Sequence, residues 1–377
     1  MIKIDELINT NCINIGNFTL KNGESSKYYY NIKNIISNPK LLKKIGDELY
    51  KKLNDFDIIC GIPYGGLPIA SYISTTYDKP MIIVRNNLKK YGTKKRIEGE
   101  YKKSDRCVII DDVITSGKSI RECINILNEK VNIVDIGVVF NRQQNPICPL
   151  PFKSLFYKND IVKFRLKKIS ASKKSNLCFS ADIEDPNKLL NLLDIIGEYI
   201  VICKIHYDII KLNDYKGDFK KDLINSSIKH NYLIMEDRKF IDISYIVNKQ
   251  YSQFNNWVDL VTVHSLVTNE VVSKLSGVLL VANMSNNNYN LSTNAIELAK
   301  NNINNVVGFI TQNRINMGDL VCMTPGISFN NKNIDDQKYR NMNDVDTDYI
   351  IIGRLLYNSN NIKNDIKKIQ KNMRETK

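Results

Sequence analysis

Short apolar segments separated by amphipathic stretches run through the first half of the chain. Segments of this length, bounded by polar residues, are typical of strands buried in a sheet. They lie at Asp57–Gly61, Met81–Arg85, Cys107–Asp111 and Ile133–Phe140. Strands that alternate with helical segments in this way predict an α/β domain with a mostly parallel sheet.

The second half repeats the alternation, with helices expected at Asn187–Ile196 and Ser292–Asn304 among others. Eight successive strand–helix units are typical of a TIM (β/α)8 barrel. The eight strands are predicted at Leu177–Asp182, Ile200–Lys204, Tyr232–Asp237, Leu260–His264, Gly277–Ala282, Val306–Ile310, Val321–Thr324 and Ile350–Gly353.

The pattern breaks between the halves at Pro146, Pro149 and Pro151, and a basic segment, Lys163–Lys174, follows. A chain of 377 residues is long enough to bury two separate cores. We therefore expect two domains, residues 1–168 and 169–377, with only a helical stub before the first barrel strand at Leu177.

Composition narrows the class of protein. Apolar residues make up 43% of the chain and charged residues 25%, the balance of a globular protein. No apolar run reaches the roughly 18 residues that span a bilayer. The start, Met1–Glu6, lacks a basic segment followed by an apolar stretch, so we expect a cytoplasmic protein with no membrane contact. The eight cysteines show no C-x-x-C spacing, which argues against a disulfide framework and a zinc cluster.

The net charge of +14 raises the hypothesis of a nucleic-acid partner. The lysines, however, are spread along the whole chain beside abundant Asn and Ile, and they form no single basic tract. We therefore expect no nucleic-acid binding, and anionic phosphate substrates explain part of the positive charge equally well.

Residues 108–119 carry the first candidate for chemistry: an apolar strand, two acids, a turn of small residues and then a helix. At the carboxyl end of a parallel strand, Asp111 and Asp112 can face ribose hydroxyls. The amides of the turn, where the helix begins, can hold a phosphate. The spacing matches neither a P-loop nor a dinucleotide fingerprint. The alternative without a binding function is a solvated turn with a capping serine. The residues of the turn are Thr115, Ser116, Gly117, Lys118 and Ser119.

This segment resembles the phosphoribosyl diphosphate (PRPP) signature of type I phosphoribosyltransferases. Its neighbours are similar to the orotate branch of that family: Leu20–Tyr30 resembles the orotate entrance, Gly61–Pro68 the pyrophosphate loop and Arg85–Gly99 the mobile catalytic loop. The resemblance implies a type I phosphoribosyltransferase fold, a dimer with shared sites, and a need for Mg²⁺ in the transfer step. It also implies substrate contacts at Lys21, Tyr29, Tyr30, Tyr64, Arg85 and Arg142, with Lys89 as a catalytic cation at the leaving diphosphate.

A charged array is the second candidate, and it lies at the predicted carboxyl ends of successive barrel strands. Lys204 follows one strand, and Asp237, Lys239 and Asp242 follow the next as D-x-K-x-x-D. Barrel enzymes place their chemistry on this face. In isolation such charges are as well explained by a surface cluster of ion pairs, but charges gathered at a barrel mouth are costly unless they are paired or used.

The second half resembles orotidine 5′-monophosphate (OMP) decarboxylases along nearly its whole length. The resemblance implies that Lys204, Asp237, Lys239 and Asp242 form the catalytic array, with Asp242 contributed to the site of a neighbouring subunit. It implies that no metal or other cofactor takes part. The three histidines offer no shared metal site by their spacing. We expect His206 and His264 to be packed structural residues at strand ends, and His230 to be a surface residue at the end of a helix. The implied contacts to the nucleotide are Ser180, Asp182, Ser285, Gln337, Tyr339, Gly353 and Arg354.

The order of the two motifs is that of the fused enzymes of the UMP synthase family. The resemblance implies two steps, in which orotate and PRPP give OMP and OMP then gives UMP. Among the positions that depart from the family pattern, Asn86 stands where Lys is usual, Ile246 where Thr is common and Leu355 where Gly is usual. Two alternatives therefore stay open, a decarboxylase with an impaired transferase half, or a transferase half that only senses a ligand.

Overall fold

The structure of the protein is a computed structural model, and it describes residues 2–20, 23–85, 96–142, 148–285, 289–329 and 338–375. Contacts between residues divide the chain into two compact units. The first unit comprises Met1–Asn14 and Tyr30–Asp160, and the second comprises Ile15–Tyr29 and Ile161–Lys377.

A six-stranded sheet forms the centre of the first unit. Its strands are β3 (Ile58–Gly61), β4 (Met81–Val84), β5 (Ile97–Glu98), β6 (Arg106–Ile114), β7 (Asn132–Asn141) and β8 (Lys153–Tyr157). Their order is β5-β4-β3-β6-β7-β8, and all neighbours are parallel except β4 and β5. The predicted α/β class with a mostly parallel sheet is confirmed, and β5 and β8 are strands that the apolar pattern did not reveal.

Helices pack on this sheet through apolar stripes. In α2 (Pro39–Lys52), Leu41, Ile45 and Leu49 recur at four-residue spacing and are buried. Pro39 stands at the first helical position and the side chain of Asn38 accepts a hydrogen bond from the Leu41 amide, so the start of this helix is fixed locally. The other helical elements of the unit are α1 (Ile4–Asn9), η1 (Ile32–Ser37), α3 (Gly66–Thr76) and α4 (Lys118–Leu127).

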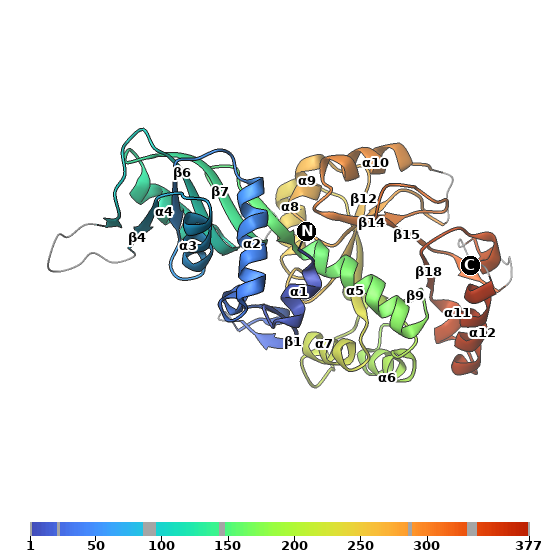
Figure 1. Ribbon diagram of the computed structural model, residues 1–377. Coiled ribbons are helices and arrows are strands. Elements are labelled where there is room, and N and C mark those ends of the chain that lie inside the picture. The colour runs from blue at the N-terminus through green and yellow to red at the C-terminus, as the bar shows by residue number, and fades with distance from the viewer. Residues whose placement is uncertain are drawn as a thin grey trace. The chain divides into compact units, whose positions relative to one another are not determined.

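The second unit contains a closed barrel of eight parallel strands (Figure 1). The strands are β9 (Leu177–Ser180), β10 (Ile202–Ile205), β11 (Leu233–Phe240), β12 (Leu260–His264), β13 (Val278–Val281), β14 (Val306–Ile310), β15 (Val321–Thr324) and β18 (Tyr349–Ile352). They pair in this order, and β18 closes the barrel against β9. The predicted TIM barrel is confirmed, and every predicted strand overlaps an observed one.

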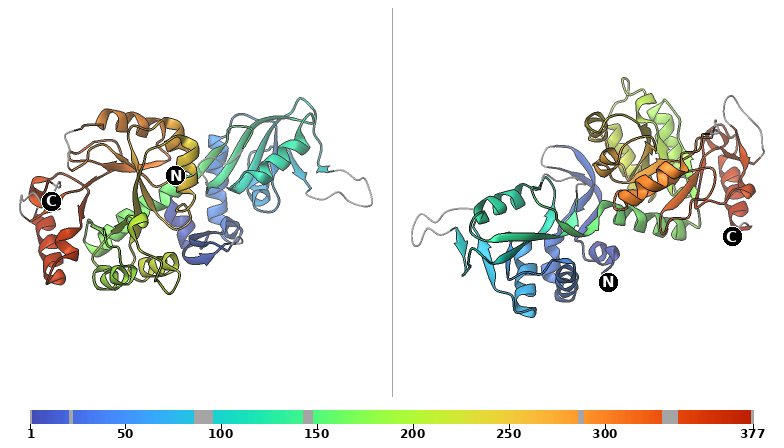
Figure 2. Two further views of the ribbon diagram at one scale, coloured as in Figure 1. Left: turned by 180° about the vertical axis from the view of Figure 1, so that it is seen from behind. Right: turned by 90° about the horizontal axis from the view of Figure 1, so that it is seen from above.

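Helices follow the strands around the barrel, and Figure 2 shows this ring from two further sides. In α6 (Pro186–Ile196), the Asp185 side chain accepts hydrogen bonds from the amides of Asn187 and Lys188 and so caps the helix. The remaining elements are η2 (Tyr207–Ile209), α7 (Phe219–Lys229), α8 (Ser244–Tyr251), α9 (Asn269–Ser273), α10 (Ser292–Asn301), β16 (Ile327–Ser328), β17 (Arg340–Asn341), η3 (Met342–Asp344), α11 (Arg354–Tyr357) and α12 (Ile362–Glu375).

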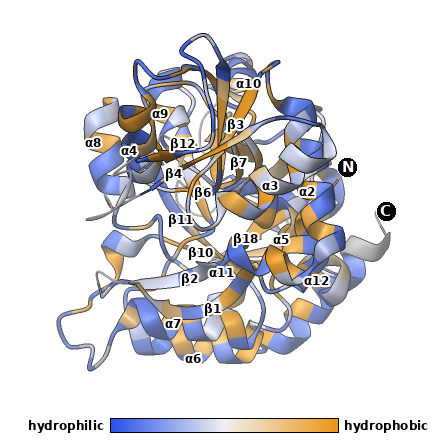
Figure 3. Cartoon of the chain, turned by 60° about the vertical axis from the view of Figure 1, so that its left-hand side comes forward, coloured by the Kyte–Doolittle hydropathy of each residue, from blue (hydrophilic) through white to orange (hydrophobic). Residues whose placement is uncertain are grey.

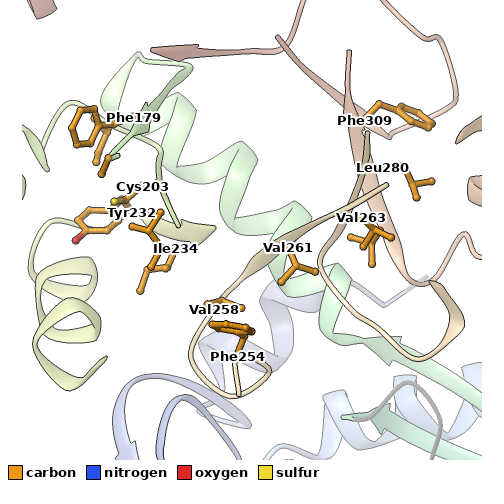
Figure 4. Close-up of a cluster of buried hydrophobic side chains, with 14 of the residues drawn as sticks. Phe179, Cys203, Tyr232, Ile234, Phe254, Val258, Val261, Val263, Leu280 and Phe309 are labelled. Carbon is orange, nitrogen blue, oxygen red and sulfur yellow. The ribbon is translucent and has the colours of Figure 1, made fainter. Parts of the chain in front are cut away.

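Alternate residues of the barrel strands point to opposite sides and build two apolar layers. Figure 4 shows part of the outer layer, in which Phe179, Cys203 and Ile234 pack beneath the helices. The inner layer contains residues such as Ile202 and Met235, one position away in the same strands. The colouring of Figure 3 distinguishes helices with one exposed face from buried strands. Helix α6 alternates between apolar and polar residues, whereas strand β3 of the first unit is apolar.

A helix of sixteen residues, α5 (Lys158–Lys173), precedes the barrel, so the expected helical stub is wrong. From residue 161 onward, α5 buries Val162, Leu166 and Ile169 against the inner layer of the barrel. The same face carries Arg165, which is also buried. A basic residue within the apolar stripe hid the helical period in the sequence. The domain boundary predicted at residue 168 lies within α5.

A hairpin of β1 (Ile13–Thr19) and β2 (Ser25–Tyr30) contributes Ile15–Tyr29 to the second unit. Lys27 is fully buried, and its Nζ lies 2.6 Å from Asp259 Oδ2, at the amino end of β12. Tyr28 donates its hydroxyl to the same carboxylate, and Arg165 Nη1 lies 3.4 Å from Asp259 Oδ1. Two cations and a hydroxyl therefore surround one buried carboxylate, and they join the hairpin, α5 and the barrel.

Among the described helices, none is long and apolar enough to cross a membrane. All eight cysteines are free thiols, and seven of them are buried.

Candidate active sites

The two acids of the first motif lie at the carboxyl end of β6, as the sequence predicted for a parallel strand. Asp111 is buried, and its Oδ1 accepts a hydrogen bond of 2.8 Å from the Asp112 amide. Burial, together with the nearby charge of Asp112, raises the pKa of Asp111 well above its usual range. Two adjacent carboxyl groups that resist joint ionisation form a place where hydroxyl donors or a cation are favoured.

The carboxyl-terminal part of β6 and the loop after β3 approach each other closely within the first unit. A Cβ atom on Gly65 would lie 2.1 Å from Asp112 Cγ, and one on Gly66 would lie 2.1 Å from the Ile110 carbonyl oxygen. Only glycine fits at both positions. Gly117 has φ of +75° and precedes the first residue of α4, so the turn enters the helix through a left-handed residue. The two loops thus border one site at the carboxyl ends of β3 and β6.

Arg142 and Tyr30, which the resemblance assigned to orotate, also lie close together in the first unit. The Arg142 guanidinium stands 5.3 Å from the centre of the Tyr30 ring, which in turn lies 4.8 Å from the ring of Phe140. The Arg142 amide donates to the Ile114 carbonyl at the end of β6. A cation and an aromatic face are therefore available beside the strand that carries the two acids.

The other residues assigned to the transferase site are more scattered. Tyr64 is 79% exposed, and Arg85 forms an ion pair of 2.9 Å with Glu98. Tyr29 belongs to the second unit, where its ring packs 5.5 Å from Phe18 in the same hairpin. Three further positions lie outside the described residues, namely Lys21, Asn86 and Lys89.

In the barrel, three residues of the charged array, Lys204, Asp237 and Lys239, form one compact cluster. Lys204 Nζ lies 2.7 Å from Asp237 Oδ2, and Lys239 Nζ lies 3.0 Å from the same oxygen. Lys204 Nζ also lies 3.6 Å from Asp182 Oδ1, and that carboxylate accepts a hydrogen bond of 3.1 Å from the Ser180 hydroxyl. The sequence spacing alone could not show these distances, because three separate strands supply the residues.

These side chains line a cavity of about 250 Å³ at the carboxyl ends of the barrel strands. The cavity brings together residues from β9, β10, β11 and β18 and from the loops that follow β13 and β15. The predicted residues in its wall are Ser180, Asp182, Lys204, Asp237, Lys239, Ser285, Tyr339, Gly353 and Arg354. Gln337 lies outside the described residues.

The cations of the cluster keep its central carboxylate charged. Burial opposes ionisation of Asp237, but Lys204, His206 and Lys239 outweigh it and hold the Asp237 pKa well below its usual range. Burial likewise disfavours the charged form of Lys204, and Asp237 and Asp182 reverse this and raise the Lys204 pKa. The cavity therefore presents a fixed negative charge between two lysines.

Comparison with known proteins shows which families the two halves of the chain match. A phosphoribosyl transferase domain matches residues 31–159, and the orotidine 5′-phosphate decarboxylase / HUMPS family matches residues 175–369. Uridine 5′-monophosphate synthase of Bos taurus is 31% identical over 441 residues, which cover 92% of this chain and 91% of that protein. The chain belongs to the uridine 5′-monophosphate synthase family. The bifunctional organisation predicted from the sequence, a transferase domain followed by a decarboxylase domain, is confirmed.

Two relatives with a single domain match one half each. Orotate phosphoribosyltransferase of Methanocaldococcus jannaschii is 40% identical over 148 residues, which cover 38% of this chain and 84% of the relative. Orotidine 5′-phosphate decarboxylase of Pichia kudriavzevii is 36% identical over 222 residues, which cover 51% of this chain and 84% of the relative. Each half of this family member thus resembles a separate enzyme.

Sequence analysis missed two residues of the decarboxylase site. His206 was expected to be structural, but it lines the cavity, with Nε2 3.3 Å from Lys204 Nζ and 3.4 Å from Asp237 Oδ2. Thr262 is fully buried and donates its hydroxyl to Asp237 Oδ1 at 2.7 Å. The K-x-H spacing of Lys204 and His206 could have revealed the histidine, because residues two apart in a strand share a face. No feature of the sequence near Thr262 indicates its contact with Asp237, which lies 25 positions away.

Asp242 does not join the cluster in its own chain. It is exposed, and its Oδ1 accepts a hydrogen bond from the amide of the next residue, Ile243. Of the positions that depart from the family pattern, Ile246 is half-buried in α8, and Leu355 packs against the outer apolar layer of the barrel. Neither of these two contributes to the wall of the cavity.

Glu236, beside Asp237 in β11, is fully buried and binds the loop after β10. Its Oε2 accepts a hydrogen bond of 3.0 Å from the Tyr207 amide, and its Oε1 has no hydrogen-bond partner among the described residues. Burial, reinforced by Asp208 and Asp237, raises the Glu236 pKa to about 8. The folded protein therefore favours the neutral carboxylic acid at this position.

The free energy of unfolding should consequently fall as the pH rises towards the pKa of folded Glu236. Between pH 4.5, its ordinary pKa, and about 8, folded Glu236 holds a proton that the unfolded chain releases, so the stabilisation present at low pH is lost. Glu236→Gln cannot ionise and should gain on the order of 4 kcal/mol in unfolding free energy relative to the parent between pH 5 and pH 8. Urea unfolding at both values measures this, with exposed Glu184→Gln as the control. An equal difference between variant and parent at both pH values would contradict the assignment.

Proposed function

We propose that this chain catalyses two consecutive reactions: orotate and PRPP give OMP and diphosphate, and OMP then gives UMP and CO₂. The observation that carries the proposal is the Lys204–Asp237–Lys239 cluster in the barrel cavity, which suits decarboxylation of an anionic substrate. The PRPP motif at the end of β6 supplies the first reaction. Membership of the uridine 5′-monophosphate synthase family supports both.

In the transferase, the ribose of PRPP lies against Asp111 and Asp112, whose carboxyl groups accept hydrogen bonds from its hydroxyls. Its 5′-phosphate is held by the amides of residues 115–119, where α4 begins. Arg142 pairs with the orotate carboxylate, and Tyr30 covers the pyrimidine ring. N1 of orotate bonds to the anomeric carbon, the bond from that carbon to the diphosphate oxygen breaks, and the N1 proton is released to the diphosphate or to water. Arg85 and Lys89 balance the charge of the departing diphosphate.

The residues at the end of β6 fit a magnesium ion. Mg²⁺ prefers oxygen ligands and is commonly held by one or two carboxylates together with substrate phosphates and water. Asp111 and Asp112 offer such carboxylates, and the raised pKa of Asp111, caused by burial and by Asp112, supports a positive charge at this place. The ion would screen the charge of the diphosphate group.

In the decarboxylase, Asp237 faces the substrate carboxylate, and the two negative charges repel each other. The bond between C6 and the carboxylate breaks, its electron pair stays on C6, and CO₂ leaves. Lys239 stabilises this negative charge and transfers a proton from Nζ to C6, which completes UMP. Lys204 keeps Asp237 charged throughout. The side chains account for every proton and charge, so we propose that this half uses no metal or other cofactor.

The remaining groups in the cavity bind the parts of OMP that do not react. Arg354, Tyr339 and Gln337 hold the 5′-phosphate beside Gly353, where a Cβ atom would lie 3.0 Å from the Ser180 carbonyl oxygen. Asp182 and Lys204 contact the ribose hydroxyls, and Ser180 and Ser285 contact the pyrimidine. Binding energy from the phosphate can thereby be used at the reacting carbon.

The decarboxylase acts as a homodimer in which Asp242 completes the partner's site. Three large apolar side chains beside Asp242 are strongly exposed: Ile241 at 55%, Ile243 at 68% and Tyr245 at 63%. Exposed apolar residues clustered around a catalytic carboxylate favour a surface that a second copy covers. We place this dimer in the cytoplasm, where its free thiols stay reduced.

Mixed dimers test the exchange of Asp242. Asp242→Asn and Lys239→Ala should each abolish decarboxylation, yet their co-expression should restore about a quarter of the parent activity, because one site in each mixed dimer is free of both substitutions. Each variant co-expressed with a second copy of itself is the control. If no activity returns, Asp242 does not act across a dimer.

Two absorbance assays test the assignment of the halves. The parent protein should consume orotate only when PRPP and Mg²⁺ are present, and it should consume OMP without either. Consumption of OMP alone would favour the alternative of an impaired or ligand-sensing transferase half. Consumption of neither substrate would refute the proposed function.

A further inference from the structure

Strand β11 contains an irregularity at the decarboxylase cluster. Its pairing with β12 is regular at Met235–Leu260 and Glu236–Val261, and it resumes at Phe240–Val263. Three residues of β11, Asp237 to Lys239, therefore face a single residue of β12, Thr262. Such a bulge redirects side chains at the cost of the regular backbone hydrogen bonds.

The side chain of Thr262 forms hydrogen bonds with two residues of the bulge. The Lys239 amide donates a hydrogen bond of 2.9 Å to Thr262 Oγ1, and the same hydroxyl donates to Asp237 Oδ1 at 2.7 Å. One hydroxyl can serve both groups, since it has one donor and two acceptor positions. Lys239 has φ of +50°, a left-handed conformation that non-glycine residues rarely adopt. The single hydroxyl thus holds the unusual backbone of one cluster residue and the carboxylate of another.

The two oxygens of Asp237 are held from different sides. Oδ2 faces Lys204 and Lys239, whereas Thr262 supplies the hydrogen bond to Oδ1. Without that bond the carboxylate could rotate about its last side-chain torsion and carry both lysines with it. The backbone of Lys239 could also relax towards a commoner conformation. Thr262 is fully buried and does not line the cavity, so these effects reach the substrate only through its two neighbours.

We propose that Thr262 is a positioning residue of the decarboxylase, whose hydroxyl fixes the Asp237 carboxylate and the Lys239 backbone in the arrangement that the reaction needs. This inference rests on the proposed decarboxylase function and adds a residue outside the charged array. Displacement of a reacting group by about 1 Å can cost on the order of 100-fold in rate. The role therefore predicts an effect on turnover more than on binding.

Thr262→Val tests the inference, because valine keeps the shape of threonine and removes the hydroxyl. We expect kcat for OMP to fall about 10- to 100-fold, with KM changed by less than about threefold. Thr262→Ser, which keeps the hydroxyl, should retain most of the parent kcat. The matched control is Thr324→Val in β15, since Thr324 is equally buried and its hydroxyl has no hydrogen-bond partner among the described residues. This control should leave kcat close to that of the parent.

A kcat of Thr262→Val equal to that of Thr324→Val would overturn the inference. If Thr262→Val does not fold, Thr262→Ala and Thr262→Ser provide the same comparison, and equal kcat values in that pair would also overturn it. UMP binding measured by calorimetry should be the same in all folded variants. Failure of the inference differs from failure of the proposed function, because in the second case the parent protein itself would not decarboxylate OMP.

Discussion

Lys239→Ala should lower kcat for supplied OMP by about 1,000-fold or more, the scale on which loss of one preorganised charge-stabilising group affects catalysis. In the proposed reaction Lys239 both stabilises the negative charge at C6 and donates the proton, and no neighbour can replace it. Lys204 lies against Asp237 and is more deeply buried than Lys239. Steady-state loss of OMP absorbance measures the effect.

Two further variants separate the chemistry of Lys239 from its charge. Lys239→Arg keeps a positive charge but hardly releases a proton, so its kcat should also fall strongly. Lys188→Ala, an exposed lysine on α6, should behave like the parent. If Lys239→Ala kept more than about a tenth of the parent kcat, Lys239 could not be the proton donor.

Asp259→Ala should destabilise the second unit by about 3–5 kcal/mol, the usual effect of removing one partner from a buried ion pair. The substitution leaves Lys27 and Arg165 buried without the carboxylate that both now face. It also removes the acceptor of a 2.8 Å hydrogen bond from the Ile234 amide. Urea unfolding followed by tryptophan fluorescence reports on this unit, because Trp257 is the one tryptophan of the chain.

The control for this prediction is an ion pair on the surface of the same unit. Lys163 and Asp319 lie 3.3 Å apart and Asp319 is 57% exposed, so Asp319→Ala should change the unfolding free energy by less than about 1 kcal/mol. The double variant Lys27→Met/Asp259→Leu should recover part of the loss, since it removes Lys27 together with its partner and leaves only the charge of Arg165 unpaired. A loss below about 1 kcal/mol in Asp259→Ala would show that the buried cluster does not stabilise this unit.

The sequence predicted the barrel because local signals agree with its architecture. The strands Leu260–His264, Val306–Ile310 and Val321–Thr324 have the predicted bounds, since each is a short apolar run between polar turns. Lys204, Asp237 and Lys239 could be placed at the barrel mouth because they come at the ends of two strands that begin as apolar runs, and the mouth lies where parallel strands end. The structure brings them together as that reasoning expected.

The missed features depend on contacts between residues that are distant in sequence. Buried Lys27 resembles a surface residue until its partner, 232 positions away, is known. Arg165 likewise interrupts an apolar stripe, which explains why the length of α5 was underestimated. Thr262 gains its role from a bulge in the neighbouring strand, and the register of pairing cannot be read from either strand alone.

Release of labelled CO₂ from orotate tests the central claim most directly. The full chain would be supplied with orotate labelled in its carboxylate, together with PRPP and Mg²⁺, and compared with Lys239→Ala. The account predicts PRPP-dependent release of labelled CO₂ by the parent, and accumulation of labelled OMP without CO₂ in the variant. Absence of PRPP-dependent CO₂ release from the folded parent would contradict the claim that one chain performs both steps.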